Sequence, residues 1–153
     1  MRTHPERRDG GFTLIEMLVV IMVIGALMAV ALPYLRTGTN KSAARGAADA
    51  IAALHAVARA AAIQRGRTAN LVIPSGTNKA LVVASKVTSS GVDTLGRVVD
   101  LAGQFGVTVT STSDSIGFSP RGIGRNSSSV RIIISKSGFS DTLTVSPGGR
   151  LKR

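Results

Sequence analysis

The chain has 153 residues, carries a formal net charge of +11 at pH 7 and contains no cysteine. This length suits one modest globular domain with one further element. The lack of cysteine excludes disulfides, thiolate metal sites and cysteine nucleophiles, and the basic balance favours polyanionic partners such as nucleic acid, anionic lipid or an acidic protein face.

Near the amino terminus, residues 12–32 form an apolar run with a single charge, Glu16. As a helix this run would span roughly 30 Å, the thickness of a bilayer core. A signal anchor or cleaved secretory signal is the simplest alternative, but the run is long for a signal core and no small-x-small site follows it. A carboxylate in hydrocarbon is costly and indicates a function. We therefore expect a transmembrane or filament-core helix over residues 12–35.

The residues around this run carry a motif, Gly10-Gly11-Phe12-Thr13-Leu14-Ile15-Glu16. It resembles the type III signal of type IV pilins and type II secretion pseudopilins. The resemblance implies that residues 1–11 are a leader, cut between Gly11 and Phe12 by a prepilin peptidase, with N-methylation of Phe12. It also implies a single-pass inner-membrane protein with its amino terminus in the cytoplasm and its globular domain in the periplasm, or at the cell surface when assembled in a filament.

Cleavage would give Phe12 a free amine one helical turn from Glu16. In a filament, Glu16 could pair with the Phe12 amine of a neighbouring subunit. Because an unpaired buried charge is strongly penalised, we expect Glu16 to set the register of assembly. Pro33 is expected to kink or break the helix near the outer edge of the bilayer.

The following segment, residues 36–66, is predicted to be an amphipathic continuation of the helix. Its helical pattern begins near Lys41, with Asn40 or Ser42 as a cap and Gly66 as the stop. One face should pack on a sheet, and the others should be polar and carry Arg45, Asp49 and Arg59, with His55 as a further candidate. The apolar face comprises Ile51, Leu54, Ala58, Ala61 and Ala62.

Residues 67–147 contain short β-branched runs separated by Gly, Ser, Thr and Asn, which is typical of strands. The turn at residues 74–78 predicts a hairpin, and residues 122–129 are expected to form a flexible loop. The fold class is therefore α+β and pilin-like, with a long N-terminal helix packed on an antiparallel β-rich domain. Strands are predicted at residues 68–73, 80–87, 98–101, 106–112, 115–118, 130–134 and 142–145.

Three segments between residues 58 and 150 resemble the GspH/FimT family: residues 58–63, 116–122 and 145–150. These proteins are minor pilins of type IV pili or minor pseudopilins of type II secretion. Phe118, Pro120 and Gly122 also have a structural interpretation, as a core residue, a strand end and a turn.

The basic side chains concentrate towards the carboxyl end. Residues 148–153 form a basic tail that resembles the glycine-arginine tail of family members that help take up DNA. Such cations would neutralise phosphates, so binding to double-stranded DNA should be non-specific and salt-sensitive. A solvated basic surface and a patch for an acidic neighbouring subunit remain alternatives. The candidates for DNA binding are Arg121, Arg125, Arg131, Lys136, Arg150, Lys152 and Arg153.

The sequence predicts no enzyme, metal site or cofactor. The aspartates of the expected mature chain are scattered, and no phosphate-binding loop or nucleophile motif occurs. Two functions remain open. The first is a FimT-like minor pilin of a type IV pilus, which helps to initiate or tip the filament and binds DNA during natural transformation. The second is a GspH-like minor pseudopilin of type II secretion. Either would have other pilins or pseudopilins as partners, whereas an isolated signal-anchored protein would lack Glu16 and the preceding glycine.

Overall fold

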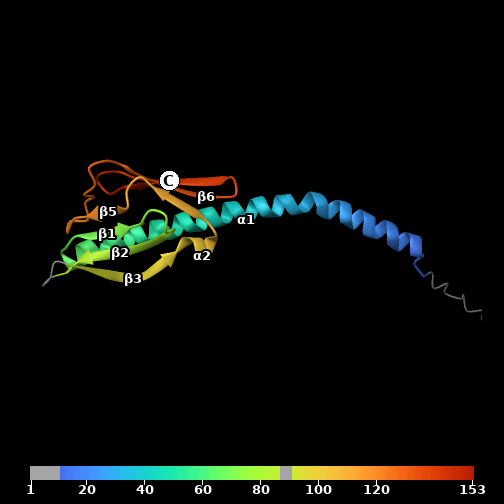
Figure 1. Cartoon of the computed structure of the whole chain (residues 1–153), viewed down its shortest axis with the longest axis horizontal. Coiled ribbons are helices and arrows are strands. Elements are labelled where there is room, and N and C mark those ends of the chain that lie inside the picture. Colours follow the sequence, from blue (N-terminus) through green and yellow to red (C-terminus); the bar gives the residue numbers. More distant parts are fainter. Residues whose placement is uncertain (1–10, 87–90) are drawn as a thin grey trace, which may run out of the picture. The chain divides into compact units, whose positions relative to one another are not determined.

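The computed structural model describes residues 11–86 and 91–153, so most of the expected leader lies outside the described residues (Figure 1). Contacts divide the chain into two compact units, Met1–Gly38 and Thr39–Arg153. The chain consists of a long N-terminal helix followed by antiparallel sheets, which confirms the predicted pilin-like α+β fold.

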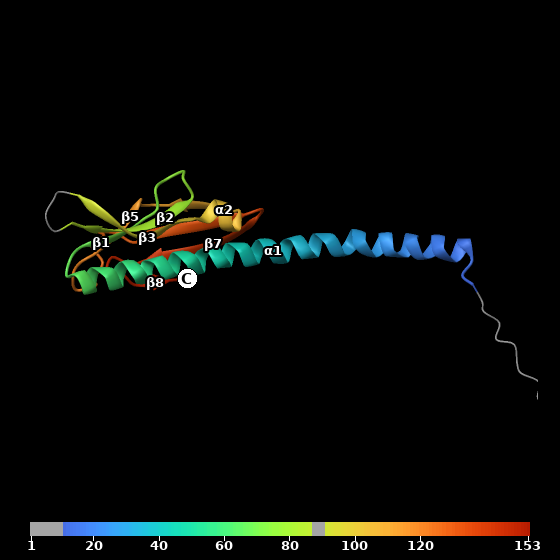
Figure 2. The same cartoon turned by 90° about the horizontal axis from the view of Figure 1, so that it is seen from below.

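The helix α1 runs from Leu14 to Arg65 (Figure 2). Thr13 caps its start, because the backbone N–H of Glu16 points to Thr13 Oγ1 at 3.3 Å and that of Met17 to the Thr13 carbonyl at 3.2 Å. The predicted break at Pro33 is wrong, because α1 continues through this residue. The predicted start of a new helical segment near Lys41 is also wrong, because the same helix already covers that position. A proline removes one backbone donor, whereas the residues on both sides keep their own helical hydrogen bonds. The Thr37 hydroxyl also donates to the Pro33 carbonyl at 3.0 Å.

The second unit contains two four-stranded antiparallel sheets and a short helix, α2, at Leu101–Phe105. In sheet A the strand order is β3-β2-β1-β5, and in sheet B it is β4-β6-β7-β8. The strands of sheet A are β1 (Ala69–Val72), β2 (Lys79–Ser85), β3 (Val92–Asp100) and β5 (Ser115–Phe118). The strands of sheet B are β4 (Thr108–Ser111), β6 (Val130–Lys136), β7 (Phe139–Val145) and β8 (Leu151–Lys152).

The predicted hairpin is confirmed, with Ala69 opposite Ala84 in the β1–β2 pair. The strand expected at residues 98–101 instead spans Val92–Asp100, and the helix α2 that follows was not expected. Asp100 ends the strand and begins this helix, because its side chain accepts a hydrogen bond from the Gly103 N–H at 2.9 Å. The structure also places the expected tail in sheet B, since Leu151–Lys152 pairs with β7 as β8.

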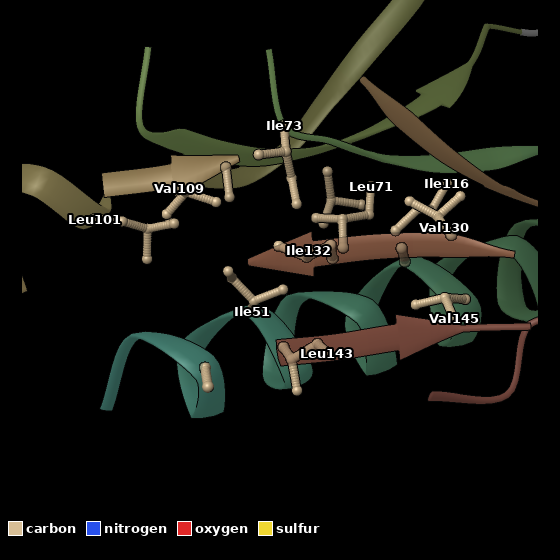
Figure 3. Close-up of a cluster of buried hydrophobic side chains, with 14 of the residues drawn as sticks. Ile51, Leu71, Ile73, Leu101, Val109, Ile116, Val130, Ile132, Leu143 and Val145 are labelled. Carbon is tan, nitrogen blue, oxygen red and sulfur yellow. The ribbon is translucent and has the colours of Figure 1, made fainter. Parts of the chain in front are cut away.

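One hydrophobic core joins the two sheets and residues 39–65 of α1. Figure 3 shows Leu71 of sheet A, Ile132 of sheet B and Ile51 of α1 gathered in this core. On α1, Leu54 and Ala61 are only partly buried, whereas His55 lies on the buried face and not on the polar one. Small residues let the backbone of α1 approach the sheets closely; the buried positions are Ala44, Ala47, Ala48, Ile51, His55, Ala58 and Ala62.

Candidate nucleic-acid interface

The first unit presents an apolar helix surface with nothing packed on it. From Phe12 to Leu35 every large apolar side chain of the described residues is exposed. Within the described residues, α1 is one helix that is long and apolar enough to cross a membrane. Such an uncovered apolar surface needs lipid or neighbouring helices around it. Phe12 and Glu16 both lie exposed at its beginning.

In the second unit, a close contact joins the loop after β5 to the turn before β8. The Gly124 N–H donates to the Gly148 carbonyl at 3.0 Å. A Cβ on Gly124 would lie 2.3 Å from the Pro147 carbonyl oxygen and 2.4 Å from Gly149 N, so no side chain fits there. We call the contact of Gly124 with Gly148 and Gly149 the glycine junction. It connects the loop that follows one segment of the sequence resemblance, residues 116–122, to another of these segments, residues 145–150.

His55 and Phe118 pack beneath this junction. Their ring centroids lie 5.0 Å apart in an edge-to-face arrangement. Burial lowers the pKa of His55 and outweighs the opposing effect of a hydrogen bond with the Gly149 backbone, while the nearby charge of Arg59 lowers this pKa further. His55 Nε2 is buried and has no hydrogen-bond partner among the described residues. His55 is therefore held as a neutral packing residue.

Arginine residues lie close to the junction in the chain and on the neighbouring face of α1. Arg125 follows Gly124 and Arg150 follows Gly149, and both are exposed. Arg121 precedes Gly122, whose backbone lies so close to α1 that a Cβ there would be 3.3 Å from Arg59 Nε. We call Arg59, Arg121, Arg125 and Arg150 the junction arginines. Arg59 was not among the DNA-binding candidates chosen from the sequence. Its position four residues before Ile63 places both residues on one face of α1, and Gly122 packs against that face.

Two further candidates lie on the outer face of sheet B. Arg131 of β6 is opposite Thr144 of β7, which is in turn opposite Lys152 of β8. Arg131 is exposed between the buried residues Val130 and Ile132, so its side chain faces away from the core.

The last two candidates are engaged within the protein. Lys136 Nζ donates to the Phe105 carbonyl at the end of α2. Arg153 Nη1 lies 2.8 Å from Asp49 Oδ1, and Arg153 Nη2 lies 2.6 Å from Asp141 Oδ2. The hydrogen bond with Asp141 raises the pKa of Arg153. Both side chains therefore have acceptors in the folded chain, which the sequence did not indicate.

The five aspartates of the second unit are likewise engaged internally. Asp49 and Asp141 hold Arg153, and Asp93 pairs with Arg65 at 3.6 Å. Asp100 caps α2, and Asp114 accepts hydrogen bonds from Ser75. Within residues 39–86 and 91–153, the junction arginines thus form no ion pair with a carboxylate. The described residues also contain no group of acidic or histidine side chains that could hold a metal ion.

The chain was compared with known proteins. The family model "Type II transport protein GspH" matches residues 47–149, and the "Prokaryotic N-terminal methylation motif" matches residues 7–32. None of the curated proteins matches the chain. Two crystal structures of the type IV minor pilin FimU of Pseudomonas aeruginosa (strain PAO1) share the fold. One has 17% sequence identity and a TM-score of 0.58, covering 74% of this chain and 90% of that chain. The other has 18% identity and a TM-score of 0.55, covering 71% and 90% respectively.

The family match covers both sides of the glycine junction, and the methylation motif covers the start of the apolar helix. The fold agrees with both, because a minor pilin has the same arrangement of helix and sheets. The chain therefore belongs to the GspH family of membrane-anchored, type IV pilin-like proteins, whose members are structural pilins and pseudopilins and not enzymes.

Proposed function

We propose that this chain is a FimT-like minor pilin of a type IV pilus, which helps to initiate or tip the filament and binds duplex DNA through the junction arginines. The observation that carries the DNA-binding part is that Arg125 and Arg150 flank the glycine junction, and Arg121 and Arg59 flank the nearby contact of Gly122 with α1, while the aspartates of the same unit are engaged elsewhere. An uncompensated group of exposed guanidinium groups attracts phosphates.

The binding should be non-specific. Specific readout needs side chains that a helix or a pair of strands inserts into a groove, whereas the junction arginines lie on loops and on the flank of α1. Stacking on single-stranded bases needs exposed aromatic rings. In the described part of the second unit, Phe118 is buried and Phe105 and Phe139 are half-buried. Duplex phosphates are therefore the favoured ligand.

The amino-terminal part of the proposal concerns assembly. Prepilin peptidase would cut between Gly11 and Phe12, and the Phe12 amine would be methylated, with the globular unit on the periplasmic side. The exposed apolar surface of α1 supports a helix that moves from the inner membrane into a filament of other pilins. Glu16 would then meet the Phe12 amine of a neighbouring subunit, because each charge lacks another partner in an apolar filament core.

A pseudopilin of type II secretion is the second candidate, and the family description favours it. In that function the junction arginines would bind an acidic face of a neighbouring subunit and not a nucleic acid. The two candidates differ in their response to duplex DNA, which gives a direct test.

The test is retardation of duplex DNA by the full-length protein in detergent micelles, over a range of salt concentrations. In the test variant Arg121, Arg125 and Arg150 become Gln. In the matched control Lys79, Lys86 and Arg97 become Gln, which removes the same charge from exposed positions in the β2–β3 region.

We expect the test variant to bind DNA at least about tenfold more weakly. The slope of log K against log salt should become less steep by roughly 3, since each phosphate contact contributes about 0.9 to it. The control should lose no more than about threefold, through the smaller net charge alone. No retardation of DNA at low salt, or equal losses in both variants, would contradict the proposal.

A further inference from the structure

A hydroxyl-lined groove of about 520 Å³ lies beside the glycine junction, where the loop before β6 meets the ends of β4 and β7. Its lining includes Thr112, Thr144, Arg131 and three consecutive serines, Ser127, Ser128 and Ser129. The groove begins one residue after the junction arginine Arg125, because Asn126 also lines it.

The loop that forms one wall is held in place by its first residue. Asn126 Nδ2 donates to the Ser115 carbonyl at 2.9 Å, and Asn126 Oδ1 accepts from the Gly117 N–H at 3.0 Å. On the opposite wall, Thr112 Oγ1 accepts from the Arg131 N–H at 3.0 Å, which leaves the Thr112 hydroxyl proton available to donate. The walls are therefore fixed by the fold and need no ligand to form.

The donors that face this space lack partners. Among the described residues, Ser127, Ser128 and Ser129 form no hydrogen bond through their hydroxyls or backbone N–H groups. The Arg131 guanidinium forms no ion pair within the same part of the chain. Of the described residues that line the groove, none carries a carboxylate side chain. Hydroxyls, N–H groups and one guanidinium are the groups that bind phosphate oxygens.

A second cation lies along the same row of sheet B. Arg131, Thr144 and Lys152 are successive cross-strand neighbours, so Arg131 and Lys152 are about 10 Å apart, two strand spacings. Thr144 between them also lines the groove. None of the lining residues in the described part of the chain is aromatic, which disfavours a neutral sugar that would need a ring to stack on.

We propose that this groove is a phosphate-binding site, and that it holds a backbone phosphate of the same duplex that the junction arginines contact. The identity of the phosphate as DNA rests on the proposed function, whereas the site itself does not. Ser127, Ser128 and Ser129 donate to the phosphate oxygens, Arg131 supplies the charge, and Lys152 attracts the next part of the duplex.

The experiment has two arms, both on the full-length protein in detergent micelles. In the first, inorganic phosphate is titrated into isotope-labelled protein and the backbone amide resonances are followed by NMR, with chloride at equal ionic strength as the reference. In the second, retardation of duplex DNA is measured. The variants are Arg131→Gln and a triple variant with Ser127, Ser128 and Ser129 changed to Ala. Arg97→Gln on β3 is the matched control for charge.

We expect phosphate, but not chloride, to shift the amides of residues 127–129 and 131, and both groove variants to abolish these shifts. Arg131→Gln should also weaken DNA binding about threefold to tenfold, with a salt slope smaller by about 1, whereas Arg97→Gln should change it less than twofold.

The two proposals fail separately. If DNA is not retarded but phosphate still shifts the groove amides, the groove is a phosphate site and the DNA-binding function is wrong. If DNA is retarded through the junction arginines while phosphate causes no shift at residues 127–129 and Arg131→Gln behaves like Arg97→Gln, the groove proposal is overturned.

Discussion

Replacing Gly124 by Ala tests whether the glycine junction holds the second unit together. The new Cβ would lie 2.3 Å from the Pro147 carbonyl oxygen, 2.4 Å from Gly149 N and 2.8 Å from Gly148 C. All three atoms belong to the backbone, so no side-chain rotation can relieve the contact. The turn must move away, which lengthens or breaks the 3.0 Å hydrogen bond from Gly124 N to the Gly148 carbonyl.

The cost follows from two terms. Overpacking of a close contact costs about 1–3 kcal/mol, and loss of one backbone hydrogen bond costs about 1 kcal/mol. We therefore expect a loss of about 3 kcal/mol of unfolding free energy, which lowers Tm by about 10–15 °C for a domain of this size. Calorimetry of the full-length protein in detergent measures this change.

The neighbouring glycine gives a matched control. A Cβ on Gly148 would meet no atom within 4 Å, so Gly148→Ala should leave Tm within about 2 °C of the parent. A drop in Tm of less than about 3 °C for Gly124→Ala, or equal drops for both variants, would show that the junction does not constrain the fold.

Three further outcomes follow from the remaining contacts. Burial lowers the pKa of His55 below 6.5 in the folded state, so below pH 6.5 the unfolded chain binds a proton that the folded chain does not. Its contribution to stability should thus be complete above that pH and be lost as pH falls towards the lowered pKa. Urea midpoints between about pH 7.5 and about pH 5.5 should show this loss, and His55→Gln should reduce it; an unchanged profile would contradict the burial argument. Arg153→Ala removes exposed ion pairs with Asp49 and Asp141, so it should cost no more than about 1 kcal/mol by denaturant titration and leave DNA retardation nearly unchanged. A tenfold loss of DNA binding would instead return Arg153 to the DNA-contacting set. Glu16→Ala leaves the amine of a neighbouring subunit unpaired at a cost of about 3 kcal/mol, so the fraction of chain in sheared filaments should fall at least about tenfold by immunoblot. Undiminished incorporation would refute the pairing.

Much of the fold could be predicted because local patterns and tertiary contacts agree. The apolar run and the alanine-rich segment both predict helix, and α1 covers them continuously. The turn at residues 74–78 predicts the β1–β2 hairpin, which pairs in the expected antiparallel way. Along β6 and β7 more buried and more exposed residues alternate, and the buried residues face the core. The predicted ends of β6 and β7 were less accurate, because pairing between the two strands, and not residue propensity, extends both of them.

The missed elements are short. The helix α2 has only five residues, although a capping Asp100 and a left-handed Gly106 with φ 62° at its two ends were signals for it. The strand β8 has two residues and follows a glycine pair, so its sequence was typical of a loose tail. Pairing with β7, which no local pattern encodes, makes it a strand.

The sequence identifies the candidate basic residues, but it does not show which of them have partners within the folded chain. Arg153 and Asp49 are 104 positions apart, and Lys136 and the Phe105 carbonyl are 31 apart, so neither partner is visible locally. Arg125 and Arg150 become neighbours because Gly124 meets Gly148 and Gly149, and Arg121 comes near Arg59 because Gly122 packs on α1. The predicted grouping of residues 148–153 as one tail therefore combined side chains that the fold separates.

The central claim is that the chain is a processed pilin subunit whose apolar helix begins with a free amine near Glu16. Intact-mass spectrometry of the protein isolated from its native membrane tests it most directly. We predict a chain that begins at Phe12 and carries one added methyl group at its amino terminus. A chain that still begins at Met1, or one that has been cut after Leu32, would contradict the account.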